Sequence, residues 1–250
     1  MGVDSGLPDF RGPEGFWRAY PPYRRLGLRF EELADPAHFD DDPALAWGFY
    51  GHRLALYRAT TPHAGYAVVR RWADRWPTRV FTSNVDGAFQ AAGFDPATVT
   101  ECHGAIGALQ CSRPCHEDTW SADGVVVEVD EETMRARPPL PVCPRCGAVA
   151  RPNILMFGDS SWVPGVHADR MAEHRDWLRA QDPATVAVVE LGAGTAVPTV
   201  RRHAELASAA SGALVRVNLS DPAVRHGHGV GIADGARATL EALDALLSRR

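Results

Sequence analysis

Three side chains suited to catalysis stand close together in the first half of the sequence. Asn84 and Asp86 lie in a polar run, residues 82–87, and His103 begins a new segment after it. An imidazole is the side chain best suited to proton transfer near neutral pH. Because an amide and a carboxylate precede it so closely, the group indicates a reaction site rather than a binding surface alone.

The elements around these residues follow an α/β pattern. Residues 80–81 read as a short buried strand, and the polar run follows at its carboxyl end, where open α/β sheets place their ligands. A short helical segment then leads away before the chain returns with His103. Amphipathic helices are expected over residues 43–58, from 61–62 to about Trp76, over 166–181 and over 236–247, and further strands over 125–129, 154–159, 185–191 and 214–218.

A glycine turn follows the strand at residues 185–191. Gly192 and Gly194 let backbone amides approach a phosphate or ribose at the helix that Pro198 begins, and Asn218 ends the next strand within reach of a ribose hydroxyl. Glycine turns of this kind also occur purely for packing. The turn is similar to the first motif of methyltransferases that use S-adenosylmethionine, but too little chain follows Gly194 for the rest of that fold.

The cysteines form a second constellation. Four of them make two close pairs, Cys111 with Cys115 and Cys143 with Cys146, which is the arrangement of a four-thiolate zinc site. The alternatives are two disulfides or plain buried thiols. With four protein ligands the ion has no open position, so a structural role is expected. Cys102 adjoins His103 in an extended stretch, where neighbouring side chains point to opposite faces, so no Cys-His dyad is expected.

Composition excludes several classes of function. The chain has 250 residues, 45% of them hydrophobic, and a net charge of -5 without a basic run. Nucleic-acid binding is therefore not expected, and no apolar stretch approaches membrane-spanning length, so we expect a soluble, cytoplasmic protein. All 26 basic residues are arginine. The absence of lysine excludes Schiff-base chemistry and a Walker-type phosphate loop.

An ordered set of motifs resembles the sirtuin family over nearly the whole chain. The set comprises Ser5-Gly-Leu-Pro-Asp9-Phe10-Arg11, Thr82-Ser-Asn-Val-Asp-Gly87, Cys102-His103-Gly104, the paired cysteines, Arg151-Pro-Asn-Ile-Leu-Met-Phe-Gly-Asp159, Gly194-Thr195 and Asn218. The resemblance implies an NAD-dependent protein-lysine deacylase. In that family the acyl oxygen of a modified lysine attacks the nicotinamide-bearing carbon of NAD, which releases nicotinamide and leads to O-acyl-ADP-ribose.

The resemblance also implies roles for individual residues. His103 matches the general base that activates a ribose hydroxyl, and Asn84 and Asp86 match residues of the ribose and nicotinamide pocket. Cofactor binding is further implied for Asp9, Phe10 and Arg11 in one loop, with Phe10 shielding the reactive carbon, and for Gly194, Thr195 and Asn218. Phe157 and Gly158 match the segment that pairs with an acylated-lysine peptide as an added strand.

Tyr50 and Arg53 match a Tyr-x-x-Arg pair of sirtuins that prefer acidic acyl groups. They stand three residues apart on one helical face, and a guanidinium can bind a succinyl or malonyl carboxylate with two hydrogen bonds. The alternative is that both residues only pack their helix against its neighbours.

The implied architecture is a Rossmann-like parallel sheet with a small inserted zinc-binding module and a helical insertion. We expect residues 1–12, 67–106 and 151–250 in the NAD-binding domain, 13–66 in the helical insertion and 107–150 in the zinc module. The family's Gly-Ala-Gly-x-Ser loop and the strand before it would precede Met1, since the chain starts inside that loop. Ser83, Ala196 and Asp159 replace the family's usual Gln, Ser and Glu.

These departures leave two alternative functions open. One is a catalytically impaired module that binds acyl-lysine or ADP-ribose. The other is an ADP-ribosyltransferase or NAD hydrolase that uses the same site.

Overall fold

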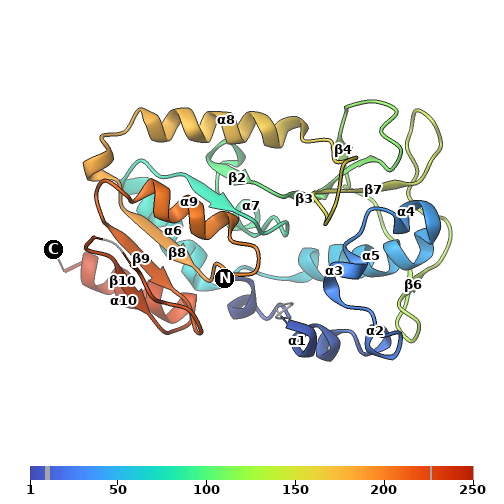
Figure 1. Cartoon of the computed structure of the whole chain (residues 1–250), viewed down its shortest axis with the longest axis horizontal. Helices are drawn as coiled ribbons and strands as arrows, with labels where there is room; N and C mark the ends of the chain where they lie inside the picture. Colours follow the sequence, from blue (N-terminus) through green and yellow to red (C-terminus); the bar gives the residue numbers. More distant parts are fainter. Residues whose placement is uncertain (9–11, 226, 250) are drawn as a thin grey trace.

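A computed structural model describes residues 1–8, 12–225 and 227–249 (Figure 1). The parallel strands and the helices α6 to α10 occupy one end of the molecule, and the helices α1 to α5 with the antiparallel strands occupy the other. The mixed α/β class predicted from the sequence is confirmed. The division into three domains stays a prediction. No helix in the described part of the chain is long and apolar enough to cross a membrane.

The parallel strands form two separate groups. β1 (Val80–Thr82) pairs with β2 (Val99–Glu101), and β8 (Val188–Leu191), β9 (Leu214–Val217) and β10 (Val230–Ile232) form a sheet in the order β10-β9-β8. The ring of Phe81 on β1 stacks on His203 at 3.9 Å between centroids. Because His203 belongs to α9, which also packs on β8, this helix connects the two groups.

Helices flank these strands. They are α6 (Ala64–Arg75), α7 (Ala88–Ala91), α8 (Gly165–Arg179), α9 (Thr199–Ala207) and α10 (Ala236–Leu247), with 3-10 turns at Gly2–Ser5, Pro96–Thr98 and Pro183–Thr185. The carboxylates of Asp95 and Asp182 each accept a backbone N–H two residues on, which begins the last two of these turns. The carboxyl ends of β1, β8 and β9 all lead into polar or glycine-containing loops, and these loops build the site.

The antiparallel part differs from the sequence prediction. β3 (Gly104–Cys111) pairs with β4 (Trp120–Ser121) and β7 (Ala150–Ile154), and β5 (Val129–Asp130) pairs with β6 (Arg135–Ala136). The strand predicted over residues 154–159 was wrong, because β7 ends at Ile154. The Asp159 carboxylate accepts the N–H groups of Met156 and Ser161 and so folds the following residues into a turn. Of the strand predicted over 125–129, only Val129 is in a ladder.

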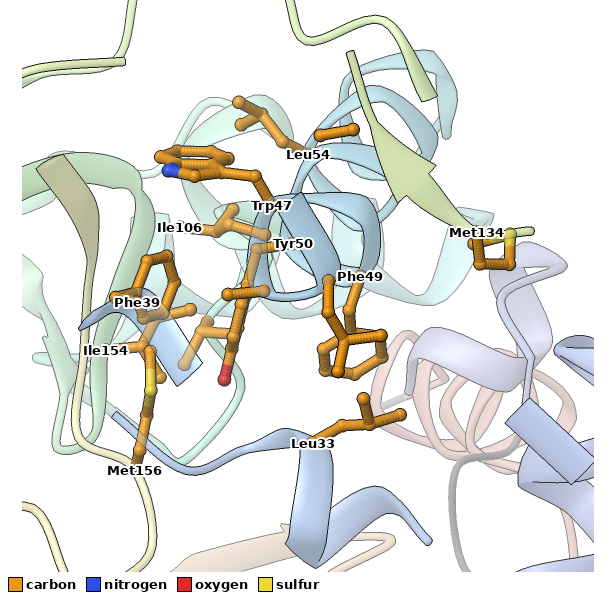
Figure 2. Packing of buried hydrophobic residues seen from close by; sticks show 14 of the residues in the cluster. Leu33, Phe39, Trp47, Phe49, Tyr50, Leu54, Ile106, Met134, Ile154 and Met156 are labelled. Carbon is orange, nitrogen blue, oxygen red and sulfur yellow. The ribbon is translucent and has the colours of Figure 1, made fainter. Parts of the chain in front are cut away.

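A cluster of aromatic side chains fills the helical end. α1 (Gly12–Ala19), α2 (Pro21–Arg25), α3 (Phe30–Leu33) and α4 (His38–Asp41) surround the long helix α5 (Pro43–Ala59). Figure 2 shows Trp47, Phe49 and Tyr50 projecting from α5 into a cluster that includes Phe39 and Ile154. A Cβ at Gly48 would lie 2.0 Å from the Met134 carbonyl oxygen, so glycine is required where α5 meets this segment.

Candidate active site

An open cavity of about 580 Å³ lies where the loops after β1, β8 and β9 meet. Its volume falls within the range of small-molecule and cofactor sites, about 300–1,000 Å³. The lining includes the predicted residues Asn84, Asp86, Gly192 and Asn218, together with Arg53. Four residues predicted to bind the cofactor, from the loops after β1, β8 and β9, thus line the same cavity as Arg53 of α5, which was predicted to bind the substrate. A dinucleotide requires such a mixture of polar groups and approachable backbone.

The chain around His103 runs beside the Asn84 loop. The Cys102 N–H donates to the Thr82 carbonyl at 2.9 Å, and the Ile106 N–H donates to the Val85 carbonyl at 2.9 Å. These two hydrogen bonds bracket His103 and place its backbone next to the Asn84 segment. The following residue, Gly104, has a φ of 79°, and a Cβ there would lie 2.1 Å from the Asn153 carbonyl oxygen. Glycine is therefore required directly after the candidate base.

Burial controls the protonation of the site. The half-buried position of His103 lowers its pKa below the ordinary value of 6.5, so the ring is neutral at pH 7. Burial also raises the pKa of Asp86, opposed by the Ala88 N–H and by the charge of Arg53. The pKa of Glu101 is raised to about 7 by burial, with Gln90 opposing and Asp86 adding to the shift. Asp86 lines the cavity, whereas His103 and Glu101 are not among its lining residues and lie on the neighbouring segment. A neutral imidazole and carboxyl groups that ionise less readily than usual therefore lie in and beside the cavity.

The predicted cofactor residues at the other side of the cavity are partly engaged in folding their own loops. Gly192 has a φ of 66°, and its N–H donates to the Val217 carbonyl at 2.8 Å. The Asn218 side-chain amide donates to the Ala193 carbonyl at 2.8 Å, and its oxygen accepts the N–H groups of Ser220 and Asp221. Asn218 thus shapes the loop that borders the cavity. Gly194 and the exposed Thr195 follow in the same loop without lining the cavity.

The predicted loop at Asp9, Phe10 and Arg11 lies outside the described residues. The two residues before it, Leu7 and Pro8, line the cavity.

Arg53 and Tyr50 occupy different surroundings although they share a helical face. The Arg53 Nε and Nη2 atoms donate to the Tyr57 hydroxyl at 3.0 and 2.8 Å, and the guanidinium lies within 6 Å of four aromatic ring centroids. Arg53 lines the cavity, whereas Tyr50 is 1% exposed in the core and burial raises its pKa to about 12. The arginine is therefore the member of the pair that borders the cavity.

The predicted substrate segment at Phe157 and Gly158 is held from three sides. The N–H groups of Leu155, Met156 and Phe157 donate to the His103 carbonyl, the Asp159 carboxylate and the Ala34 carbonyl, at 2.9, 3.3 and 3.0 Å. Phe157 is nevertheless 43% exposed. Because these N–H groups have partners, an added strand would have to use the carbonyl groups and Gly158.

The four paired cysteines converge as a metal site. Their sulfur atoms all lie within 4.8 Å of one another, with 3.6 Å between Cys111 and Cys146 and 3.8 Å between Cys115 and Cys143. A tetrahedral zinc ion with Zn–S bonds of about 2.3 Å needs sulfur atoms about 3.8 Å apart. Gly147, with a φ of 73°, donates its N–H to the Cys143 carbonyl and closes the second turn. The predicted four-thiolate zinc site is confirmed by this fit, and the disulfide alternative is excluded because all four thiols are free.

The comparison with known families decides the assignment. The model of the Sir2 family matches residues 1–177. The chain belongs to the Sir2 family. This confirms the sirtuin assignment made from the sequence motifs and the fold that it implied.

Curated relatives of this Sir2 chain are named as NAD-dependent protein deacylases. One from Caldanaerobacter subterraneus is 32% identical over 157 residues, 62% of this chain and 56% of that protein, so the match spans little more than half of that relative. Another, from Pyrobaculum aerophilum, is 32% identical over 227 residues, 90% of this chain and 78% of that protein. The enzyme class and the use of NAD named for these relatives are those that the motifs predicted.

A solved structure described as a Sir2 homologue in complex with NAD shares the fold. Its TM-score is 0.68 at 24% identity, over 99% of this chain and 85% of that one.

Tyr57, which lines the cavity, and Glu101, which lies two residues before His103, were not singled out from the sequence. Glu101 is a buried carboxyl two positions before His103, and Tyr57 holds Arg53 from one helical turn further along α5. The spacing of four between Arg53 and Tyr57 was a usable signal, because residues four apart on a helix are neighbours. Glu101 gave no separate signal, because its burial depends on the packing of β2 against β1 and α8.

Proposed function

We propose that this chain removes acyl groups from protein lysines with consumption of NAD, and that acylated-lysine proteins or peptides are its partners. The observation that carries the proposal is the convergence of Asn84, Asp86, Gly192 and Asn218 on one cavity, beside the His103 segment. NAD would supply the electrophilic carbon that accepts the acyl oxygen. The names of the curated relatives support the same reaction class.

The side chains divide the work according to their surroundings. His103 is the general base, because burial keeps its ring neutral and able to accept a proton from a ribose hydroxyl. Asn84 and Asp86 hold the ribose and nicotinamide end, and Gly192 and Asn218 border the remainder of the dinucleotide. Phe157 and Gly158 contact the peptide. The zinc site stabilises the strands that support this segment, because Cys111 ends β3 and β7 follows the second cysteine pair.

Mass spectrometry tests this proposal. Acetyl-, malonyl- and succinyl-lysine peptides are incubated with the protein and NAD, and free lysine and O-acyl-ADP-ribose are expected as products. Nicotinamide formed with ADP-ribose and intact peptide would instead indicate an NAD hydrolase, and bound but unchanged peptide would indicate a binding module.

The rate should depend on pH through His103. Since burial lowers the pKa of His103, the catalytic neutral form persists to below pH 6.5, and kcat/KM should fall only as the pH drops through that lower value. Protonation of Glu101, whose pKa is raised to about 7, is an alternative cause of a fall in kcat/KM at low pH. The Glu101→Gln variant should therefore keep the acid limb. If the fall in kcat/KM at low pH disappears in this variant, the titrating group is Glu101 and not His103.

We further propose a preference for succinyl and malonyl groups, carried by Arg53. The guanidinium lines the same cavity as Asn84 and Asp86, and Tyr57 fixes its orientation through two hydrogen bonds. Tyr50 packs beneath it with the guanidinium 5.5 Å from the ring centroid. A carboxylate entering this cavity would meet a cation with little conformational freedom left to lose.

The Arg53→Met variant should distinguish acyl groups. Loss of a charge-assisted hydrogen bond of about 1.5–3 kcal/mol corresponds to a roughly 10–150-fold lower kcat/KM for succinyl-lysine peptide. The value for acetyl-lysine peptide should change little. Arg58→Met is a matched control on the same helix, since Arg58 donates to the carbonyl groups of Val125 and Ala122 rather than facing the cavity. Equal losses with both peptides would refute the acyl preference and place Arg53 in cofactor binding or folding.

A further inference from the structure

His116 is a buried imidazole beside the four cysteines. It directly follows Cys115, its side chain is 6% exposed, and its Nε2 atom lies 3.4 Å from the Cys143 sulfur. The Trp120 ring packs against it at 5.9 Å between centroids. The ring is therefore fixed next to a sulfur of the four-cysteine site. The protein shields this sulfur from solvent, since Cys143 is 1% exposed.

One backbone contact indicates which nitrogen of His116 carries the proton. The Asp118 N–H donates to Nδ1 at 3.1 Å, so Nδ1 is the acceptor. In a neutral imidazole the hydrogen then resides on Nε2, the atom that faces Cys143. Asp118 itself is held by an ion pair with Arg145, which lies between Cys143 and Cys146 in the second turn. The chain thus ties the loop of the first cysteine pair to that of the second through this ring.

We propose that His116 donates an Nε2–H hydrogen bond to the Cys143 thiolate and so retains zinc in the site. Four thiolates around one divalent ion leave a formal charge of about -2 on the cluster, and N–H donors stabilise that charge. A buried sulfur cannot obtain this stabilisation from water. Hydrogen bonds to metal ligands typically change metal affinity by about 10–100-fold. The inference concerns metal retention and does not rest on the acyl-lysine reaction.

Two substitutions separate the hydrogen bond from the shape of the ring. His116→Phe keeps a flat ring without the donor, and His116→Gln keeps an N–H near the Nε2 position. Zinc transfer to a chromophoric chelator should show a roughly 10–100-fold weaker site in the Phe variant and recovery of most of that loss in the Gln variant. His228→Phe, at an exposed histidine, is the control and should match the wild type. Equal affinities of the Phe variant and the wild type, or equal losses in the Phe and Gln variants, would overturn the proposal.

A spectroscopic measurement on the unsubstituted protein tests the same bond without any variant. After replacement of zinc by cadmium-113, a scalar coupling between the metal and the His116 Nε2 proton is expected, transmitted through the sulfur. Two results would overturn the proposal. One is a visible Nε2 proton with no coupling to cadmium. The other is a direct coupling between cadmium and a ring nitrogen that has lost its proton, which would make His116 a ligand instead.

Discussion

Replacing His103 with alanine is expected to lower kcat/KM for deacylation by about 10²–10⁴-fold, the usual contribution of a general base. The imidazole is neutral because burial lowers its pKa, and its backbone is fixed between two hydrogen bonds to the Asn84 segment. Steady-state kinetics with an acyl-lysine peptide measure the loss.

The adjacent Cys102 is the matched control for this substitution. Burial raises the pKa of its thiol to about 12, so the thiolate needed for nucleophilic catalysis does not form. Cys102→Ala should therefore keep most of the activity, while both variants retain the unfolding midpoint within a few degrees. Activity of His103→Ala within tenfold of the wild type would contradict the assignment of the base, and loss of activity in Cys102→Ala alone would point to the thiol.

Replacing Arg151 with methionine is expected to have the largest effect on stability, about 3–5 kcal/mol. Arg151 and Asp159 form an ion pair at 2.6 Å with both side chains fully buried. Removing the arginine leaves a buried carboxylate, and Asp159 also accepts the N–H groups of Met156 and Ser161. The turn that carries Phe157 and Gly158 would lose its support, so peptide binding should weaken as well. Urea unfolding measures the change in the free energy of unfolding.

Two further variants make the Arg151 result specific. Arg137→Met removes an exposed arginine that pairs with Glu128 and Asp130, and exposed pairs are worth about 0–1 kcal/mol. The double variant Arg151→Met with Asp159→Leu should recover much of the lost stability, because no unpaired buried charge remains. A loss below about 1 kcal/mol in Arg151→Met, comparable with the exposed control, would show that the buried pair does not hold the turn.

Local patterns predicted the parts of the structure that depend on neighbours in sequence. The helix predicted over residues 236–247 matches the bounds of α10, and α5 begins at Pro43, the residue at which the predicted helix over 43–58 starts. Asn84 and Asp86 were placed at a strand end because a polar run followed a buried strand. Their position at the cavity follows from that local order.

Contacts between distant residues explain what the sequence did not predict. The strand expected over residues 154–159 fails because Arg151 and Asp159 meet across the segment and turn it. The surroundings of Tyr50 were also not predicted, because its burial depends on packing against Phe39 of α4, whose ring centroid lies 5.7 Å from that of Tyr50. The domain boundaries and the side chains that contact the reactants stay predictions.

The stoichiometry of nicotinamide release tests the central claim most directly. The unsubstituted protein is incubated with NAD and an acyl-lysine peptide, and nicotinamide and deacylated lysine are counted in the same samples over time. One nicotinamide is expected for each lysine freed, and almost none without acylated peptide. Nicotinamide released at the same rate with and without peptide, or lysine freed without nicotinamide, would contradict it.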